Sequence, residues 1–277
     1  MKAATAIGIG IAFVSLIVGG IMKGTQPTAL MNPAAFVIIL PTTLGCTIAA
    51  CGMARAKLIP TLFKKAISPP EQDLGGSVQQ LVGFAERARK DGLLALEEDV
   101  EAIEDEFTRK GLQLVVDGTD PELLAEVLEA DTQAMHARHK ANATVFTKAG
   151  AFAPTIGVMG TVIGLVHVLG NLSAPETLGP SIATAFIATL YGIGAANVVF
   201  LPVGARLQAL SAEEVHMRNL ILEGVLAIQA GDNPRVVQEK LLSYVPPAER
   251  EAVRDGGGAK PNLSAVDGGA AATAKAA

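Results

Sequence analysis

Two threonines, Thr161 and Thr189, are the side chains of this sequence whose type and position are suited to handling an ion. Each lies near the middle of a long run without Asp, Glu, Lys or Arg, at 149–175 and 177–205. If the two runs pack as antiparallel helices, both hydroxyls lie at one depth and offer oxygen ligands to a water chain or a bare cation. The alternative is that each hydroxyl bonds to the backbone carbonyl four residues earlier. Spacing alone leaves both interpretations open.

Small residues accompany the threonines at helical spacing. One row consists of Ala185, Thr189, Gly192 and Ala196, and the other of Gly157, Gly160, Thr161 and Gly164. Residues three and four apart share one face of a helix. Because small side chains let helices approach closely inside a membrane, these rows predict close helix packing.

Prolines interrupt the apolar runs at Pro41, Pro154, Pro180 and Pro202. Each removes one backbone hydrogen bond and bends its helix. Pro154 and Pro202 both lie near the ends of their apolar runs that adjoin charged segments of the chain. A coupled bend at these two prolines could therefore transmit movement into the charged segment that precedes the third run. The alternative is a static kink, which membrane helices tolerate.

Four runs without a charged residue explain why the chain is 50% hydrophobic but only 18% charged, namely 3–22, 33–54, 149–175 and 177–205. Each is long enough to cross a hydrocarbon layer of about 30 Å. The first run is too long for a signal peptide and lacks a small-residue cleavage site, so we interpret it as an uncleaved helix. The sequence therefore predicts an all-α integral membrane protein, with four transmembrane helices and a large helical cytoplasmic insertion between spans two and three.

Positive charge predicts the orientation of these spans. If the four runs cross the membrane, the segments that connect them lie alternately on its two sides. All Lys and Arg residues except Lys23 then lie on one side, and positively charged segments stay in the cytoplasm. Both termini are therefore expected in the cytoplasm. The predicted organisation is a transmembrane hairpin at 1–54, a cytoplasmic helical domain at 55–148, a second hairpin at 149–205, cytoplasmic helices at 206–255 and a disordered Gly/Ala tail at 256–277.

The charged segments carry helix signals of their own. Apolar residues recur three and four apart over 77–114, which indicates helical structure. Pro121 follows a turn and starts a predicted helix of about 25 residues that can continue into span three. Helical spacing returns over 206–230, and Pro234 starts a last helix expected to end near Tyr244.

Several function classes are disfavoured by what the sequence lacks. No carboxylate lies in a predicted span, so a partner must supply any acid that binds and releases an ion. His167 is the one titratable candidate in a predicted span. It either lies near the membrane interface or bonds to neighbouring backbone, or it acts as an ion relay. Cys46 and Cys51 point apart around one helix, which argues against a disulfide. No metal cluster, cofactor motif, nucleophile or basic stripe is evident, so neither an enzyme nor a nucleic-acid binder is expected.

The runs APTIGVMGTVIGL at 153–165, LGPSIA at 178–183 and ATLYG at 188–192 resemble the MotA/PomA family of flagellar stator A subunits. The resemblance continues through RKDGLLALEE at 89–98, VVDG at 115–118 and GVLAIQAGDNPR at 224–235. It covers nearly the whole chain to about Tyr244, with the motifs in the expected order.

This resemblance implies an assembly of five A subunits around two MotB/PomB-type B subunits in the bacterial inner membrane, where the B subunit supplies the missing Asp. It implies that Thr161 and Thr189 line the path of a transported H⁺ or Na⁺. It assigns Pro154 and Pro202 to torque generation. The rotor switch-complex protein would then be engaged by four charged residues, Arg89, Lys90, Glu97 and Glu98.

Ion identity stays open, because sodium-driven and some proton-driven members carry both hydroxyls. Two alternatives also remain. A TolQ/ExbB-type energiser of outer-membrane processes resembles a three-span layout with the large segment after the first span, unlike this chain. A non-conducting membrane scaffold would pack through the same glycine rows.

Overall fold

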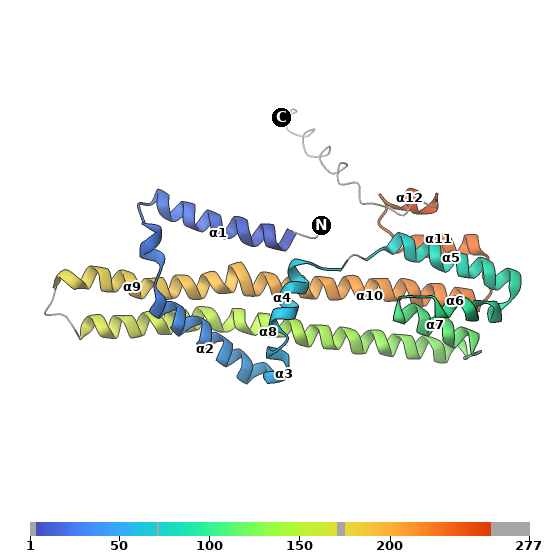
Figure 1. The fold of residues 1–277 in the computed structure, drawn as a ribbon, viewed down its shortest axis with the longest axis horizontal. Coiled ribbons are helices and arrows are strands. Elements are labelled where there is room, and N and C mark those ends of the chain that lie inside the picture. The colour runs from blue at the N-terminus through green and yellow to red at the C-terminus, as the bar shows by residue number, and fades with distance from the viewer. Residues whose placement is uncertain (1–3, 71, 171–174, 256–277) are drawn as a thin grey trace, which may run out of the picture. The chain divides into compact units, whose positions relative to one another are not determined.

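The computed structural model describes residues 4–70, 72–170 and 175–255, and these ranges contain helices but no strand. The helices of the first part are α1 (Ala4–Met22), η1 (Pro27–Leu30), α2 (Pro33–Cys51), α3 (Met53–Ala56) and α4 (Ile59–Ile67). Those of the middle are α5 (Leu74–Asp91), η2 (Leu93–Leu96), α6 (Glu97–Glu101), α7 (Glu106–Val116) and α8 (Pro121–Leu169). The rest are α9 (Pro175–Gly194), η3 (Ala195–Phe200), α10 (Leu201–Gln229), α11 (Pro234–Leu242) and α12 (Arg250–Arg254) (Figure 1). The all-α prediction is confirmed for the described residues, and the predicted tail lies outside them.

Packing divides the chain into two compact units. The span unit comprises Met1–Pro70 and Met135–Ala212, and the acidic unit comprises Glu71–Ala134 and Glu213–Ala277. The long helices α8 and α10 contribute residues to both. These limits reflect packing, whereas the predicted limits near 54, 149 and 205 reflect charge and concern the membrane. The latter therefore stay a prediction.

Four helices among the described residues are long and apolar enough to cross a membrane, and they correspond to the four charge-free runs. They are Ala4–Met22, Pro33–Cys51, Pro121–Leu169 and Leu178–Gln229. The third runs for 49 residues without interruption. The prediction that the helix starting at Pro121 continues into the third apolar run is thus confirmed.

Helix α2 begins and ends at residues whose chemistry favours a boundary. The Asn32 side chain accepts hydrogen bonds from the backbone of Ala34 and Ala35, at 3.1 and 3.2 Å, and Pro33 occupies the first turn. At the other end, Gly52 has a φ of +82°, a conformation that glycine adopts readily and other residues avoid. The chain turns there into α3 and α4.

The segment before Pro202 is a π-helix, η3, inside an otherwise α-helical run. Proline lacks the N–H that would bond to the carbonyl of Val198, and its ring crowds that carbonyl. A wider turn before the proline relieves this crowding, and π segments of this kind often occur at functional sites. The sequence predicted a bend at Pro202 but not this change of helix type.

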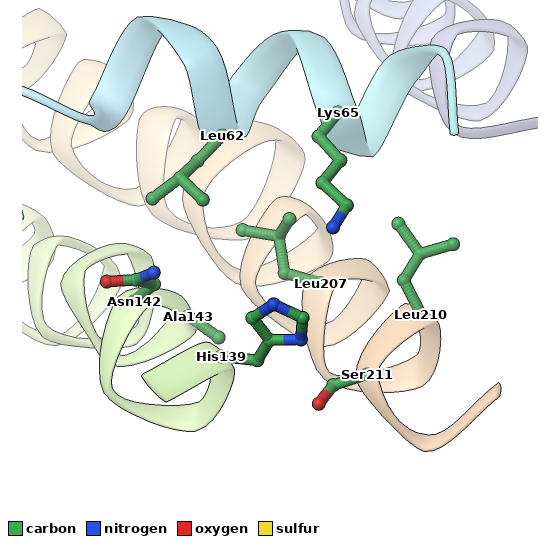
Figure 2. A pocket seen from close by; sticks show the side chains of 8 residues that line it. All are labelled: Leu62, Lys65, His139, Asn142, Ala143, Leu207, Leu210 and Ser211. Carbon is green, nitrogen blue, oxygen red and sulfur yellow. The ribbon is translucent and has the colours of Figure 1, made fainter. Parts of the chain in front are cut away.

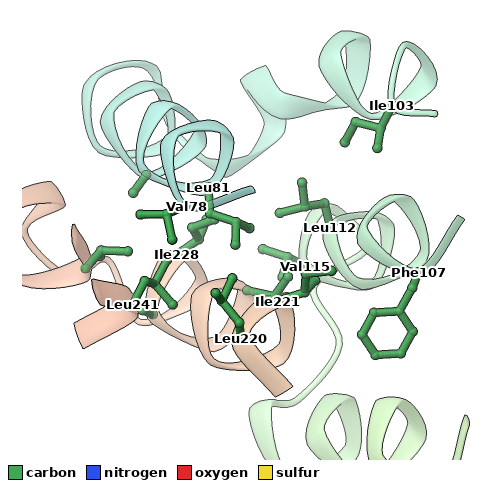
Figure 3. Close-up of a cluster of buried hydrophobic side chains, with 14 of the residues drawn as sticks. Val78, Leu81, Ile103, Phe107, Leu112, Val115, Leu220, Ile221, Ile228 and Leu241 are labelled. Atoms are coloured by element: carbon green, nitrogen blue, oxygen red, sulfur yellow. The ribbon is translucent and has the colours of Figure 1, made fainter. Parts of the chain in front are cut away.

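The core of the acidic unit is built from large aliphatic side chains on α5, α7, α10 and α11 (Figure 3). Leu81 of α5, Leu112 of α7, Leu220 of α10 and Leu241 of α11 are essentially inaccessible to solvent. The helical periodicity expected over 77–114 is present, but the segment is divided into several helices. Gly92, with a φ of +89°, ends α5 and turns the chain into η2.

Candidate functional site

Helices α8 and α9 approach each other so closely that glycine is required at the contact. A Cβ atom added at Gly157 would lie 3.0 Å from the Ala188 carbonyl oxygen, and one at Gly192 would lie 2.9 Å from the Gly157 Cα. At Gly164 it would lie 2.7 Å from the Ala185 Cβ. The small-residue rows thus face each other, as their spacing predicted.

Thr161 and Thr189 meet inside this contact. Their hydroxyl oxygens lie within hydrogen-bonding distance of each other, and Thr161 is almost completely buried. The Thr161 Oγ1 atom also lies 3.2 Å from the carbonyl oxygens of Gly157 and Ala185. The hydroxyl carries one hydrogen and can donate it to only one of these acceptors at a time. The two hydroxyls therefore face each other, and for Thr161 the carbonyl four residues earlier is a competing acceptor.

Chemically, the site is a cluster of neutral oxygen atoms from two helices. Two hydroxyls and two backbone carbonyls are hard oxygen ligands of the kind that water, hydronium or a small cation uses. The cluster contains no acid, and within the described residues no group of three or more His, Cys, Asp or Glu side chains could hold a metal ion. The site can therefore relay or pass an ion but does not itself bring a negative charge.

A second polar group joins the start of α2 to α9 and was not recognised in the sequence. The Tyr191 hydroxyl donates to the Leu30 carbonyl at 2.5 Å, and the Asn32 backbone N–H lies 3.3 Å from the same hydroxyl. The Asn32 side chain also donates to the Thr184 carbonyl at 3.3 Å. These bonds join the start of α2 to α9 beside Thr189. The Asn-Pro pair that begins at Asn32 is a pattern typical of a helix start. No local pattern in the sequence, however, indicates that Tyr191 is the hydrogen-bond partner of this segment.

Helix α2 adds two fully buried threonines. Thr47 donates to the Thr43 carbonyl at 2.7 Å, while the Thr43 hydroxyl oxygen is buried without a hydrogen-bond partner among the described residues. A buried hydroxyl without a partner is costly, which marks Thr43 as a further polar group in the span unit. Sequence reasoning did not single out either residue.

The two prolines assigned to torque generation are both half-buried in the span unit. Pro154 directly follows Ala153, whose carbonyl oxygen faces Gly192, so it lies at one end of the tight α8–α9 contact. Pro202 follows the π-helix and lines a cavity of about 320 Å³ together with Asn197 and residues of α1. The structure places both prolines beside the helix pair, at different contacts.

A smaller pocket, of about 20 Å³, lies between α4, α8 and α10 (Figure 2). It has room for about one water molecule. Lys65, His139 and Ser211 are among its lining residues, but Thr161 and Thr189 are not. It is too small to bind an organic substrate.

The four charged candidates lie on either side of the Gly92 turn. Arg89 and Lys90 are exposed in the last turn of α5, and Glu97 and Glu98 are exposed in the first turn of α6. Buried neighbours hold this segment, because Ala85 and Leu96 both pack into the aliphatic core. Among the described residues, none of the four charges takes part in an ion pair, so they are available to another molecule.

The remaining candidates from the sequence are His167 and the two cysteines. His167 is exposed near the end of α8 and lies outside the threonine cluster. Cys46 is exposed, Cys51 is half-buried, and both thiols are free, as their spacing predicted.

Comparison with known families first gives the class of this protein. Residues 99–219 match the MotA/TolQ/ExbB proton channel family. This stretch contains the whole threonine cluster and both prolines of the helix pair. With four apolar helices, the chain is therefore a multi-pass membrane protein of the channel class.

Comparison with individual proteins identifies the family more narrowly. The chain is 39% identical to motility protein A of Bacillus subtilis over 251 residues, which is 90% of this chain and 93% of the relative. It is 36% identical to motility protein A of Borreliella burgdorferi, over 90% of this chain and 96% of the relative. The fold is similar to the C. jejuni MotAB structure, with a TM-score of 0.86 and 32% identity over 89% of this chain and 97% of that chain. It is also similar to the flagellar MotAB stator complex from Bacillus subtilis, with a TM-score of 0.84 and 38% identity over the same shares. The chain belongs to the motility protein A family.

Proposed function

We propose that this chain is the ion-conducting A subunit of a bacterial flagellar stator, which couples H⁺ or Na⁺ flow across the inner membrane to torque on the rotor. The observation that carries the proposal is the contact between Thr161 and Thr189, held by glycines where the charge-free runs of α8 and α9 pack together. The similarity to MotAB stator structures supports it. Because the site lacks a carboxylate, the chain requires a B subunit that supplies an Asp at membrane depth.

The proposed arrangement places both termini and the acidic unit in the cytoplasm, and five copies around two B subunits. Ion passage at the A/B boundary would change the hydrogen bonding of the Thr161 hydroxyl, which has several acceptors within reach. The close α8–α9 contact would pass that change to Pro154, and the π-helix beside Pro202 is a place where helix geometry can adjust. Crossing 100 mV supplies about 2.3 kcal/mol per elementary charge, which is enough to drive such steps.

Torque would reach the rotor through Arg89, Lys90, Glu97 and Glu98. Exposed charges form weak contacts that salt screens and that break rapidly. A motor needs such contacts, because a strong one would hold the rotor in place. The rigid aliphatic core behind these residues allows them to transmit force.

Replacement of Thr189 by valine tests the ion path. Valine keeps the shape of the side chain and removes the hydroxyl, so we expect ion flux to fall by up to about tenfold, the effect of one lost hydrogen bond. Flux is measured as ion-dependent growth inhibition in cells that also express a B subunit without its plug. Thr155→Val is the matched control, because Thr155 is exposed on α8 and bonds only to its own helix in the described structure. Normal flux in Thr189→Val would show that this hydroxyl has no part in conduction.

The same assay separates the competing functions. A non-conducting scaffold would cause no growth defect with the plug-free B subunit, and a TolQ/ExbB-type energiser would support outer-membrane processes without motility. The ion is identified by replacing sodium with potassium at constant membrane potential while swimming speed is recorded. Unchanged speed excludes sodium as the driving ion.

A further inference from the structure

Charge is divided between the two units very unequally. The span unit carries ten of the 22 Lys and Arg residues, but Glu176 is its one residue among the 27 Asp and Glu residues of the chain. No acid precedes residue 71. The span unit therefore has a formal charge of +9, from ten positive residues and one negative. Eight of these ten positive residues lie after span two or next to spans three and four.

Helix α4 lies at the level where the apolar runs end. Its Ala66 packs in a buried cluster with Ala143 and Phe146 of α8 and with Val203 and Leu207 of α10. These positions lie within a few residues of the ends of the charge-free runs at 149 and 205. Because a charge-free run ends where the hydrocarbon layer ends, α4 lies at the boundary between lipid tails and headgroups.

The segment from Met53 to Lys65 combines residues that pack inward with exposed basic and apolar residues. Leu62 and Lys65 point toward α8 and α10, where they line the small pocket with His139 (Figure 2). Three basic residues of the segment are exposed, Arg55, Lys57 and Lys64. Two large apolar side chains are exposed among them, Met53 by 56% and Leu58 by 41%. Basic and apolar side chains exposed together are typical of helices that lie in the membrane interface.

We propose that α3 and α4 form a binding site for anionic phospholipid headgroups, with Arg55, Lys57 and Lys64 as the residues that contact phosphate. Met53 and Leu58 insert among the acyl chains beside the headgroups. The site lies on the leaflet next to α4, which is the cytoplasmic leaflet in the orientation proposed above. It is independent of ion conduction, so either proposal can fail without the other.

Anionic lipid is favoured over other occupants of this surface for two reasons. The site begins one residue after Gly52, which ends an apolar helix, so the bilayer is the nearest partner available. A positive segment next to a membrane helix is also attracted by the negative surface potential of anionic lipids.

The test uses the full-length chain with its B subunit, reconstituted in vesicles of equal parts phosphatidylcholine and phosphatidylglycerol. Spin-labelled versions of each lipid report the fraction immobilised by the protein, and the ratio of the two fractions gives the preference for the anionic lipid. Each basic residue near an anionic surface strengthens binding by up to about fivefold. Because the signal averages over all surrounding lipids, we expect Arg55→Gln/Lys57→Gln/Lys64→Gln to lower the ratio by about twofold.

Two variants control for charge and folding. Arg89→Gln/Lys90→Gln/Arg235→Gln removes the same charge from exposed residues of the acidic unit, and the ratio should not change. Arg55→Lys/Lys57→Arg/Lys64→Arg keeps the charge and should keep the ratio even if packing is disturbed. Salt at about 0.5 M should lower the wild-type ratio, because it screens exposed charges.

Three results would overturn the proposal. The wild type could immobilise both lipids equally, which would show no preference for anionic headgroups. The triple Gln variant could retain the wild-type preference. The control in the acidic unit could lose the preference equally, which would make it a property of net charge rather than of this site.

Discussion

The span unit and the acidic unit hold their helices together by opposite means. In the span unit, α8 and α9 touch through glycine and alanine, and a Cβ atom added at Gly157 or Gly164 would lie 3.0 or 2.7 Å from the facing helix. In the acidic unit, helices touch through fully buried leucine, isoleucine and valine side chains. Lipid tails are as apolar as leucine, so burial of large side chains gives helices no advantage inside a membrane, and close backbone approach replaces it. In water, the same burial is the main stabilising contribution.

The largest expected effect comes from adding one methyl group to the span unit. In Gly192→Ala, the new Cβ would overlap the Ala153 carbonyl oxygen and lie 2.9 Å from the Gly157 Cα. Neither backbone atom can move aside without separating α8 from α9, so we expect a cost of about 1–3 kcal/mol or more. Membrane assembly, measured by gel filtration of the solubilised complex, and motility should both be lost.

Two other glycines show whether this effect is local. Gly179 lies on the same helix and Gly83 lies on α5 of the acidic unit, and neither would bring a new Cβ within 4 Å of another group. Gly179→Ala should be neutral, and Gly83→Ala should stabilise α5 by about 0.5–1 kcal/mol. If Gly192→Ala assembled as well as these two variants, packing by close backbone contact would not distinguish the units.

The acidic unit should respond to the opposite change, removal of a large side chain. Leu128 of α8 is fully buried beside Gly111 of α7, and Leu128→Ala should cost about 2–5 kcal/mol. Faster amide exchange in α7, followed by mass spectrometry, would report this loss, and torque should fall while ion flux persists. Leu123→Ala is the control, because Leu123 is 51% exposed on the same helix. Equal exchange in the two variants would contradict the core described here.

Charge reversal tests the exposed surface of the acidic unit. Arg89→Glu/Glu97→Arg should reduce torque several-fold and leave assembly intact, since both residues are exposed. Torque is measured from the rotation of tethered cells. The control reverses Arg254 and Glu239, an exposed ion pair of the same unit at 2.9 Å. Full torque in the first variant, with Lys90 and Glu98 also neutralised, would remove rotor contact from this segment.

The sequence predicted most of the fold, because the distribution of apolar and charged residues alone distinguishes membrane-spanning segments from segments that fold in water. It predicted the four apolar helices and the continuity of α8 into the third apolar run, since each depends on helical periodicity and length. For Thr161 and Thr189 it left two interpretations open, because spacing does not determine which acceptor a hydroxyl uses. It did not predict the π-helix, which depends on how Pro202 is accommodated by its surroundings. Nor did it predict the Tyr191 bond to Leu30, because two residues so distant in sequence leave no local pattern.

The smallest expected effect concerns that same bond. Tyr191→Phe removes only the hydroxyl that accepts from the Asn32 N–H and donates to the Leu30 carbonyl, which should cost about 1 kcal/mol. Because Tyr191 lies two residues from Thr189, loosening the start of α2 should also let the threonine pair separate more often. We therefore expect a modest loss of ion flux, measured with the plug-free B subunit.

Replacement of the second member of the group shows whether the effect on flux comes through Tyr191 alone. Asn32→Ala removes the caps on Ala34 and Ala35 and the bond to Thr184, but leaves the Tyr191 bond to Leu30. It should destabilise the start of α2 by about 0.5–2 kcal/mol. Flux should fall less than in Tyr191→Phe if the position of α9 controls the threonine pair. A larger loss of flux in Asn32→Ala would instead show that the start of α2, rather than the tyrosine on α9, positions the hydroxyls.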